Sequence, residues 1–253
     1  MASTDIILTT QLSEEQQLAL DLLRSGDNIF LTGGAGSGKS FIIREFMKDQ
    51  DRDALPILAS TGAAAVLLGG RTFHSFFGIG IMEGGLEATI ARASRDGKLM
   101  KRLARVEGII IDEISMIPGE ALYAAEFLSQ KARQSTLPWG GMRVIAVGDF
   151  GQLPPVTLAG KKRDWCFLHE VWTKTGFVVC QLKLNQRVKE AYYLKVLDQI
   201  RSGTIDQDVK NFLNSRLKVH DDAHSGTRLF PRREQADGYN MKKLSEIESE
   251  EHI

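Results

Sequence analysis

A glycine-rich loop between a strand and a helix is the feature that most constrains the fold of this chain. The segment Gly33-Gly34-Ala35-Gly36-Ser37-Gly38-Lys39-Ser40 fits the pattern G-x-x-x-x-G-K-[ST] of a phosphate-binding loop. Apolar residues predict a strand over 28–32 before it and a helix over 41–46 after it. In this context backbone N–H groups and a helix N-terminus can hold an anion. We therefore expect all eight residues to bind a nucleoside triphosphate, with Lys39 on the β- and γ-phosphates and Ser40 on Mg²⁺.

The order of the expected elements predicts an α/β fold. Apolar strands are expected at 28–32, 57–60, 108–111, 143–147 and 177–182, between helices that include 13–25, 62–68 and 122–133. Strands without polar alternation are typical of a parallel sheet covered by helices on both faces. We interpret 1–183 as one ATPase domain with a small basic insertion at about 79–105. Helices at 192–201 and 206–216 and a short strand at 227–230 are interpreted as the incomplete start of a second domain, 184–253.

Composition narrows the class of protein. The 253 residues carry a net charge of zero, so the field of the whole molecule gives no indication of a polyanionic partner. No apolar run is long enough to cross a bilayer, and residues 1–11 lack the pattern of a secretory signal. Cys166 and Cys180 are predicted to be buried or inert thiols in a reducing compartment. The basic run at 92–105 is either a solvated helix face or a contact for a polyanion.

Two acids follow directly after the expected strand at 108–111. Ligands of open α/β sheets bind outside the carboxyl ends of the strands, so Asp112 and Glu113 would face the phosphate-binding loop. We interpret Asp112 as a Mg²⁺ ligand and Glu113 as the base that polarises the attacking water. A turn without a catalytic role is the alternative for these acids.

A glutamine follows the expected strand at 143–147. The segment 148–156 has the sequence Gly-Asp-Phe-Gly-Gln-Leu-Pro-Pro-Val, in which the two prolines stiffen the turn that carries Gln152. The Gln152 amide can hydrogen-bond both a γ-phosphate and a water molecule. We therefore expect Gln152 to sense which nucleotide is bound.

Segments 33–40, 112–116 and 148–156, in this order, resemble the Pif-type family of superfamily-one DNA helicases. Further similar segments cover almost the whole chain. They are 12–16 (the Q-motif), 60–64 and 72–78 (single-strand-binding motifs), 121–134 (a signature helix), 184–187 (an arginine-finger motif) and 229–231. The resemblance implies a RecA-like domain that binds ATP and Mg²⁺, a small wedge-like insertion, and the start of a second RecA-like domain.

The resemblance also implies roles for single residues. Gln16 would read the adenine edge, and Arg187 would stabilise charge that develops on the γ-phosphoryl group. Gln16 has an alternative, because Ser13 and Gln16 have the spacing of a helix-capping box. A surface salt bridge is the alternative for Arg187.

Single-stranded DNA contacts are implied for five residues: Thr61, Gly62, Phe73, His74 and Ser75. A hydroxyl such as that of Thr61 commonly donates to a DNA phosphate. Packing is an equal alternative for His74 and its aromatic neighbours. No second His or Cys lies at metal-binding spacing from His74, so zinc is not expected.

The function that follows from the resemblance is an ATP-dependent DNA helicase that moves 5′ to 3′. It would act on single-stranded DNA and DNA junctions as a monomer, without a membrane, in repair, recombination and telomere maintenance. Its location would be the cytoplasmic nucleoid in a bacterium or phage, and the nucleus or mitochondrion in a eukaryote. Two later motifs of the second domain are not found before Ile253, so we interpret the chain as an N-terminal fragment. The alternative is a nucleotide-gated module that binds DNA or a partner without unwinding; a GTPase is excluded because no Asn-Lys-x-Asp motif occurs.

Overall fold

The structure is a computed structural model that describes residues 12–157, 160, 162–188, 190–217 and 227–247. It divides into two compact units, residues 1–204 and 205–253, which are described separately. Segment 1–11 and most of the acidic tail at 245–251 lie outside the described residues. The domain boundary expected at 183/184 stays a prediction about where a second RecA-like domain begins.

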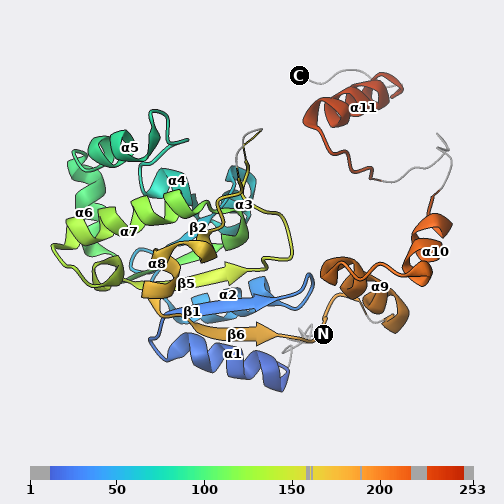
Figure 1. Cartoon of the computed structure of the whole chain (residues 1–253), viewed down its shortest axis with the longest axis horizontal. Helices are drawn as coiled ribbons and strands as arrows, with labels where there is room; N and C mark the ends of the chain where they lie inside the picture. Colours follow the sequence, from blue (N-terminus) through green and yellow to red (C-terminus); the bar gives the residue numbers. More distant parts are fainter. Residues whose placement is uncertain (1–11, 158–159, 161, 189, 218–226, 248–253) are drawn as a thin grey trace, which may run out of the picture. The chain divides into compact units, whose positions relative to one another are not determined.

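The strands of the first unit form one parallel sheet with the order β3-β2-β4-β5-β1-β6 (Figure 1). Their bounds are β1 (Ile29–Gly33), β2 (Ile57–Ala59), β3 (Arg71–Thr72), β4 (Gly108–Asp112), β5 (Arg143–Gly148) and β6 (Val178–Leu182). Strand β5 therefore lies between β1 and β4, although it follows both in the sequence. This order brings the loops after β4, β5 and β1 side by side at the carboxyl edge of the sheet.

Helices of the first unit follow the strands as expected, with several additions. The helices are α1 (Glu14–Arg24), α2 (Lys39–Phe46), α3 (Gly62–Leu68), α4 (Phe73–Phe76), α5 (Gly85–Ala93), α6 (Gly97–Arg105), α7 (Gly119–Arg133), α8 (Glu170–Thr175) and α9 (Ala191–Ser202). Short 3₁₀ helices lie at Met47–Asp49, Ile114–Met116, Pro138–Gly141 and Cys166–Leu168. The sequence pattern did not predict helices α4 to α6 and α8 or the two-residue strand β3.

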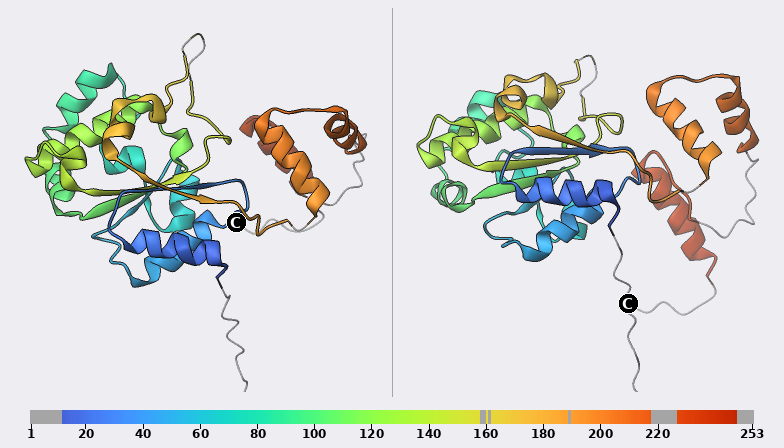
Figure 2. Two further views of the ribbon diagram at one scale, coloured as in Figure 1. Left: turned by 60° about the horizontal axis from the view of Figure 1, so that its bottom comes forward. Right: turned by 90° about the horizontal axis from the view of Figure 1, so that it is seen from below.

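Alternating side chains of the central strands enter two separate cores. Ile110 and Ile145 pack with α1 and α2 on one face, whereas Ile109, Ile111 and Val144 pack with α4 to α8 on the other. Figure 2 shows α1 and α2 on one side of the sheet and the green helices on the opposite side. The predicted parallel sheet with both faces covered is confirmed.

The expected basic insertion is helical and joins the larger core. Leu99 and Leu103 of α6 are fully buried, and α6 packs along α7. The Asp96 carboxylate accepts hydrogen bonds from the Lys98 and Leu99 N–H groups and so begins α6. Buried leucines thus fix this helix to the larger core, while Lys98, Lys101 and Arg105 remain at the surface.

The second unit contains helices α10 (Gln207–Ser215) and α11 (Arg233–Ser245). The strand expected at 227–230 is wrong, because these residues have no regular secondary structure and no described strand pairs with them. Four residues with β propensity form a strand only when a neighbouring strand supplies hydrogen bonds.

Cys166 and Cys180 are both free and buried, as predicted, and burial raises the pKa of the Cys166 thiol to about 12. Within the described ranges, every helix is too short or too polar to span a lipid bilayer.

Candidate nucleotide site

The phosphate-binding loop connects β1 to α2, as predicted. Gly36 and Gly38 have φ angles of +79° and +96°, a region that side chains rarely adopt. A Cβ at Gly36 would also lie 2.8 Å from the Cβ of Arg187. The hydroxyl of Ser37 is buried and has no hydrogen-bond partner among the described residues. These features fit a loop that wraps an anion with its backbone.

Lys39 begins α2 and folds back over its own loop. Its Nζ donates hydrogen bonds to the carbonyl oxygens of Gly33 at 2.7 Å and Gly34 at 3.1 Å. Burial lowers the pKa of Lys39, and the nearby carboxylates of Asp149, Glu113 and Asp112 partly oppose this shift. The ammonium group is therefore held at the loop and faces three acids that come from two other strands.

Asp112 and Glu113 lie at the end of β4, where the sequence predicts them. Burial raises the pKa of both carboxyl groups, and for Glu113 the neighbouring Asp112 adds to the rise. Asp112 Oδ1 accepts a hydrogen bond from the Glu113 N–H at 3.0 Å. Glu113 has a φ of +52°, which is unusual for a residue with a side chain. Such strained backbone positions cluster at functional sites.

The loop after β5 is organised by Asp149, whose role the sequence analysis missed. Asp149 is 1% exposed, and its carboxylate accepts hydrogen bonds from Gln152 Nε2 at 3.1 Å and the Gly151 N–H at 3.0 Å. Arg201 of α9 holds the same carboxylate with two nitrogens, Nη2 at 2.5 Å and Nε at 3.2 Å. Burial alone would raise the pKa of Asp149, but these hydrogen bonds outweigh burial and lower it.

Arg201 was not identified because nothing near it in the sequence marks it. It lies 52 residues from Asp149 in the chain, on a helix with no glycine loop or acidic pair beside it. Only the fold brings its guanidinium to Asp149. A fork of this kind fixes the orientation of a carboxylate as well as its charge.

The segment that carries Arg187 packs directly on the phosphate-binding loop. Asn185 Nδ2 donates to the Ala35 carbonyl at 2.8 Å, and the Gln186 N–H donates to the Gly36 carbonyl at 2.8 Å. Asn185 Oδ1 accepts hydrogen bonds from the N–H groups of Arg187 and Val188, both at 2.9 Å. Among the described residues, Arg187 forms no ion pair.

A second missed residue, Glu15 of α1, holds the start of this segment. Its two carboxylate oxygens accept hydrogen bonds from the Lys183 N–H at 2.7 Å and the Leu184 N–H at 3.1 Å. Glu15 is separated from these residues by more than 160 positions in the sequence. The N-terminal helix therefore anchors the segment that leads to Arg187.

Gln16 adopts the capping-box geometry that was one of its two alternatives. The Ser13 N–H donates to Gln16 Oε1 at 3.0 Å, and the Gln16 N–H donates to Ser13 Oγ at 3.3 Å. Gln16 Nε2 lies 3.0 Å from the position that a Cβ on Gly38 would occupy. The cap thus holds the amide against the phosphate-binding loop, and its role with adenine stays a prediction.

The residues expected to contact DNA differ in exposure. Thr61 and Gly62 are exposed at the start of α3, where Thr61 Oγ1 accepts a hydrogen bond from the Ala64 N–H at 3.3 Å. Ser75 is exposed and His74 is half-buried, and burial lowers the pKa of His74. Phe73 is fully buried in the larger core, so its side chain has no surface for DNA. Packing is the role that the structure gives Phe73, and DNA contact by the other four stays a prediction.

A parallel sheet with a phosphate-binding loop after β1, acids after β4 and a polar loop after the intervening β5 defines the class of RecA-like P-loop proteins. Comparison with known proteins identifies the family. Residues 11–214 match the model of the PIF1-like helicase family, and the chain belongs to that family.

Individual relatives agree with this assignment. The ATP-dependent DNA helicase Pif1 of Bdellovibrio bacteriovorus is 64% identical over 243 residues, which are 96% of this chain and 55% of that protein. The human ATP-dependent DNA helicase PIF1 is 32% identical over 96% of this chain and 38% of its own length. This chain thus spans about half, or less, of these relatives.

Solved structures support the same family. The Pif1 helicase from Candida albicans matches 95% of this chain and 56% of that chain, at 33% identity and a TM-score of 0.83. Pif1 helicase from Bacteroides in complex with ADP-AlF3 and single-stranded DNA matches 95% of this chain and 58% of that chain, at 28% identity and a TM-score of 0.76. The RecA-like fold expected from the sequence is confirmed.

Proposed function

We propose that this chain hydrolyses ATP in response to single-stranded DNA, as part of a helicase that moves 5′ to 3′ and unwinds DNA. The carrying observation is that Lys39, Glu113 and the Asp149–Gln152 loop, from three strands, lie at one edge of the sheet. The relatives are named ATP-dependent DNA helicases, which supports ATP as the nucleotide and DNA as the polymer. DNA junctions as substrates, a monomeric state and, for a bacterial chain, a location at the nucleoid belong to the same proposal.

The residues present fit a nucleoside triphosphate with Mg²⁺. The buried Ser37 hydroxyl lacks a partner among the described residues, and Gly33 and Gly36 leave no room for side chains. The Ser40 hydroxyl and the Asp112 carboxylate would hold the metal, which uses few protein ligands in such sites. When bound, Mg²⁺ supplies positive charge to the phosphate oxygens.

Side chains of the protein would bind the phosphates, accept the proton of the attacking water and sense the γ-phosphate. Lys39 would exchange the Gly33 and Gly34 carbonyls for phosphate oxygens, which are stronger acceptors because they are charged. Glu113, whose pKa is raised by burial, would accept a proton from the attacking water more readily than an exposed carboxylate. Gln152 would contact the γ-phosphate and pass its loss to the loop that Asp149 and Arg201 hold.

Hydrolysis with and without single-stranded DNA tests this proposal. ATP turnover by the parent chain should rise when DNA is added. Lys39→Ala should lower turnover at least about 10³-fold, the lower end of the range of about 10³ to 10⁵ that one cation on the transferring phosphoryl group can contribute. Lys48→Ala is the matched control, because Lys48 is exposed just after α2 and, within the described part of the chain, pairs only with Glu45.

Three outcomes separate the alternatives. Equal turnover by Lys39→Ala and the parent would contradict the nucleotide site. ATP-dependent binding of DNA without strand separation would favour the alternative of a nucleotide-gated binding module. Turnover that ignores DNA would contradict the proposed coupling.

A further inference from the structure

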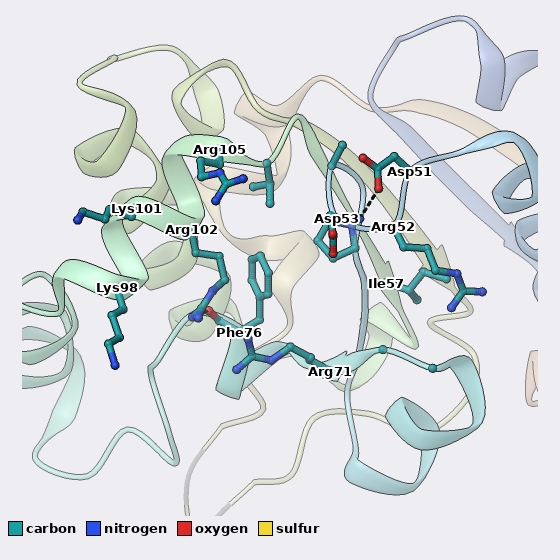
Figure 3. Close-up of a pocket in the computed structure, with 15 residues that line it drawn as sticks. Asp51, Arg52, Asp53, Ile57, Arg71, Phe76, Lys98, Lys101, Arg102 and Arg105 are labelled. Atoms are coloured by element: carbon teal, nitrogen blue, oxygen red, sulfur yellow. Dashed lines mark hydrogen bonds between the residues drawn. The ribbon is translucent and has the colours of Figure 1, made fainter.

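A cleft of about 780 Å³ opens beside edge strand β3, away from the nucleotide site. Its walls come from α6, the segment that leads into β2 and the turn that leads into β3 (Figure 3). Residues 54 and 56, which precede β2, and Val106, which precedes β4, are among its lining. In a parallel sheet these amino ends lie at the edge opposite the phosphate-binding loop.

Cations dominate this surface, which we call the basic cleft. Six cationic side chains line it against two carboxylates, those of Asp51 and Asp53. None of the six forms an ion pair within the part of the chain that the structure describes. The basic cleft is lined by Arg52, Arg71, Lys98, Lys101, Arg102 and Arg105. Like charges gathered without counter-charges create a local potential that attracts anions, even though the net charge of the chain is zero.

Arg102 lies at the floor of the basic cleft, and its guanidinium group uses only some of its hydrogen-bond donors. Its Nη2 donates to the Phe76 carbonyl, and its guanidinium carbon lies 5.0 Å from the centre of the Phe76 ring. Its Nε is buried and has no hydrogen-bond partner among the described residues. Burial and the neighbouring Arg71 both lower the pKa of Arg102, and the carboxylate of Asp96 only partly opposes them.

The arrangement fits a chain of phosphates better than a single one. Lys98, Lys101 and Arg105 follow one another on α6 at intervals of three and four residues, so they share one helix face. At about 1.5 Å per residue they span about 10 Å. Each strand of a DNA duplex places phosphates about 3.4 Å apart along the helix axis, so a face of this length can meet more than one phosphate. The guanidinium of Arg102 already covers the Phe76 ring, which leaves no aromatic platform for a base.

We propose that the basic cleft is a second DNA-binding site, which holds the phosphate backbone of a strand without reading its sequence. The choice of DNA over another polyanion rests on the proposed function. Because contact is with phosphates, affinity should depend strongly on salt and little on base composition.

Charge reversal on α6 tests the site. The variant Lys98→Glu/Lys101→Glu/Arg105→Glu changes only exposed side chains. Its matched control, Arg44→Glu/Lys131→Glu/Lys210→Glu, makes the same change of charge at exposed residues outside the basic cleft. Affinity for a fluorescent single strand and for a tailed duplex is measured by anisotropy across a series of salt concentrations. Loss of three contacts should weaken single-strand binding about tenfold to 100-fold at 0.1 M salt and reduce the salt slope by about two.

The outcomes distinguish this proposal from the proposed function. Equal affinity and slope for the α6 variant and its control would overturn the basic cleft as a DNA site, even if DNA still stimulated ATP turnover. Turnover without DNA should be the same in the α6 variant as in the parent, because no nucleotide-site residue is changed. If the charge-reversed variant loses its thermal transition, it is replaced by Lys98→Gln/Lys101→Gln/Arg105→Gln. This neutral variant should show the same loss of affinity and of salt slope, at smaller magnitude. Competition by free ATP or by poly-glutamate as strong as that by unlabelled DNA would show a general anion site instead and overturn the assignment to DNA.

Discussion

At the scale of single residues, one side chain of this site serves both the helix and the loop. Gln16 Oε1 completes the capping box of α1, while Nε2 has no hydrogen-bond partner among the described residues and lies next to Gly38. The cap uses only the oxygen of the Gln16 amide. The two alternatives for Gln16 are therefore compatible, because one end of the amide stabilises the helix and the other remains available to a base.

Ser13→Ala and Gln16→Ala separate these two roles. Ser13→Ala should lower the free energy of unfolding by about 1 kcal/mol, as loss of an N-cap does, without changing the preference for ATP over GTP. Gln16→Ala should reduce that preference at least tenfold. Binding of both nucleotides and chemical denaturation are measured for each variant. If the two variants alter nucleotide preference equally, Gln16 acts only as a cap.

Glu113 is the residue whose substitution should separate binding from chemistry. Glu113→Gln keeps the size of the side chain but removes the base, so ATP affinity should stay within about threefold while turnover falls about 10² to 10⁴-fold. Equilibrium binding of a fluorescent ATP analogue and steady-state hydrolysis measure the two quantities. Loss of binding would instead assign Glu113 a structural role at its strained position after β4.

At the scale of elements, helices distant in the sequence hold the loops of the site. Helix α9 supplies Arg201 to Asp149, and α1 supplies Glu15 to the segment before Arg187. Neither helix contains a residue of the phosphate-binding loop. The loops thus derive their positions from contacts that span 52 residues in one case and more than 160 in the other.

Arg201→Ala should damage turnover more than nucleotide binding. It removes the fork on the buried Asp149 carboxylate, so the loop that carries Gln152 loses a fixed position. We expect kcat to fall about tenfold and the KM for ATP to change less than threefold, since misplacement of a catalytic group costs mainly rate. Arg201→Lys should restore part of the loss, because one ammonium replaces the charge but not the fork. The exposed Lys195 on the same helix provides the control Lys195→Ala, and an equal effect of that change would contradict the role of Arg201.

At the scale of the whole molecule, strand order assembles the site. The sheet places β5 between β1 and β4, so the Asp149 loop lies between the phosphate-binding loop and the acids Asp112 and Glu113. The buried carboxyl group of Asp149, the half-buried ones of Asp112 and Glu113, and Lys39 then influence one another. Their balance should be visible in the stability of the protein as a function of pH.

Asp149 should stabilise the fold above its unfolded pKa and lose this effect in acid. Its pKa is lower in the folded protein, so between about pH 5 and 7 the carboxylate is charged in both states and its stabilisation is complete. Below about pH 4 the unfolded chain binds the proton first, and the contribution declines as pH falls through the folded pKa. The pKa values of Asp112 and Glu113 are raised in the folded protein, so their contributions to stability change with pH in the opposite direction.

A comparison with Asp149→Asn isolates this contribution from the other acids. The difference in free energy of unfolding between the parent and Asp149→Asn is measured by denaturation from pH 3 to 7. It should be constant at the upper end of this range and shrink toward the lower end. A difference that stays constant down to pH 3 would contradict the role of the ion pair with Arg201.

Local sequence patterns were sufficient to predict much of this fold and of the nucleotide site. Periodicity identified the strands from β1 to β6 except the two-residue β3, because buried parallel strands are continuous apolar runs. The glycine loop and the acids after β4 could be predicted because each is a contiguous segment with its own chemistry. The strand expected at 227–230 was wrong, since a strand depends on a partner that propensity does not reveal.

Contacts between distant segments had to come from the folded molecule. The sequence runs β1, β4, β5, but the sheet runs β4, β5, β1, and this rearrangement makes the Asp149 loop the neighbour of both others. The same is true of Arg201, of Glu15 and of the basic cleft, whose cations come from three separate segments. The amino-acid sequence alone therefore identifies the nucleotide loop and the family resemblance, because these are local. The pairing of parallel strands is non-local, so only the three-dimensional fold establishes which side chains meet.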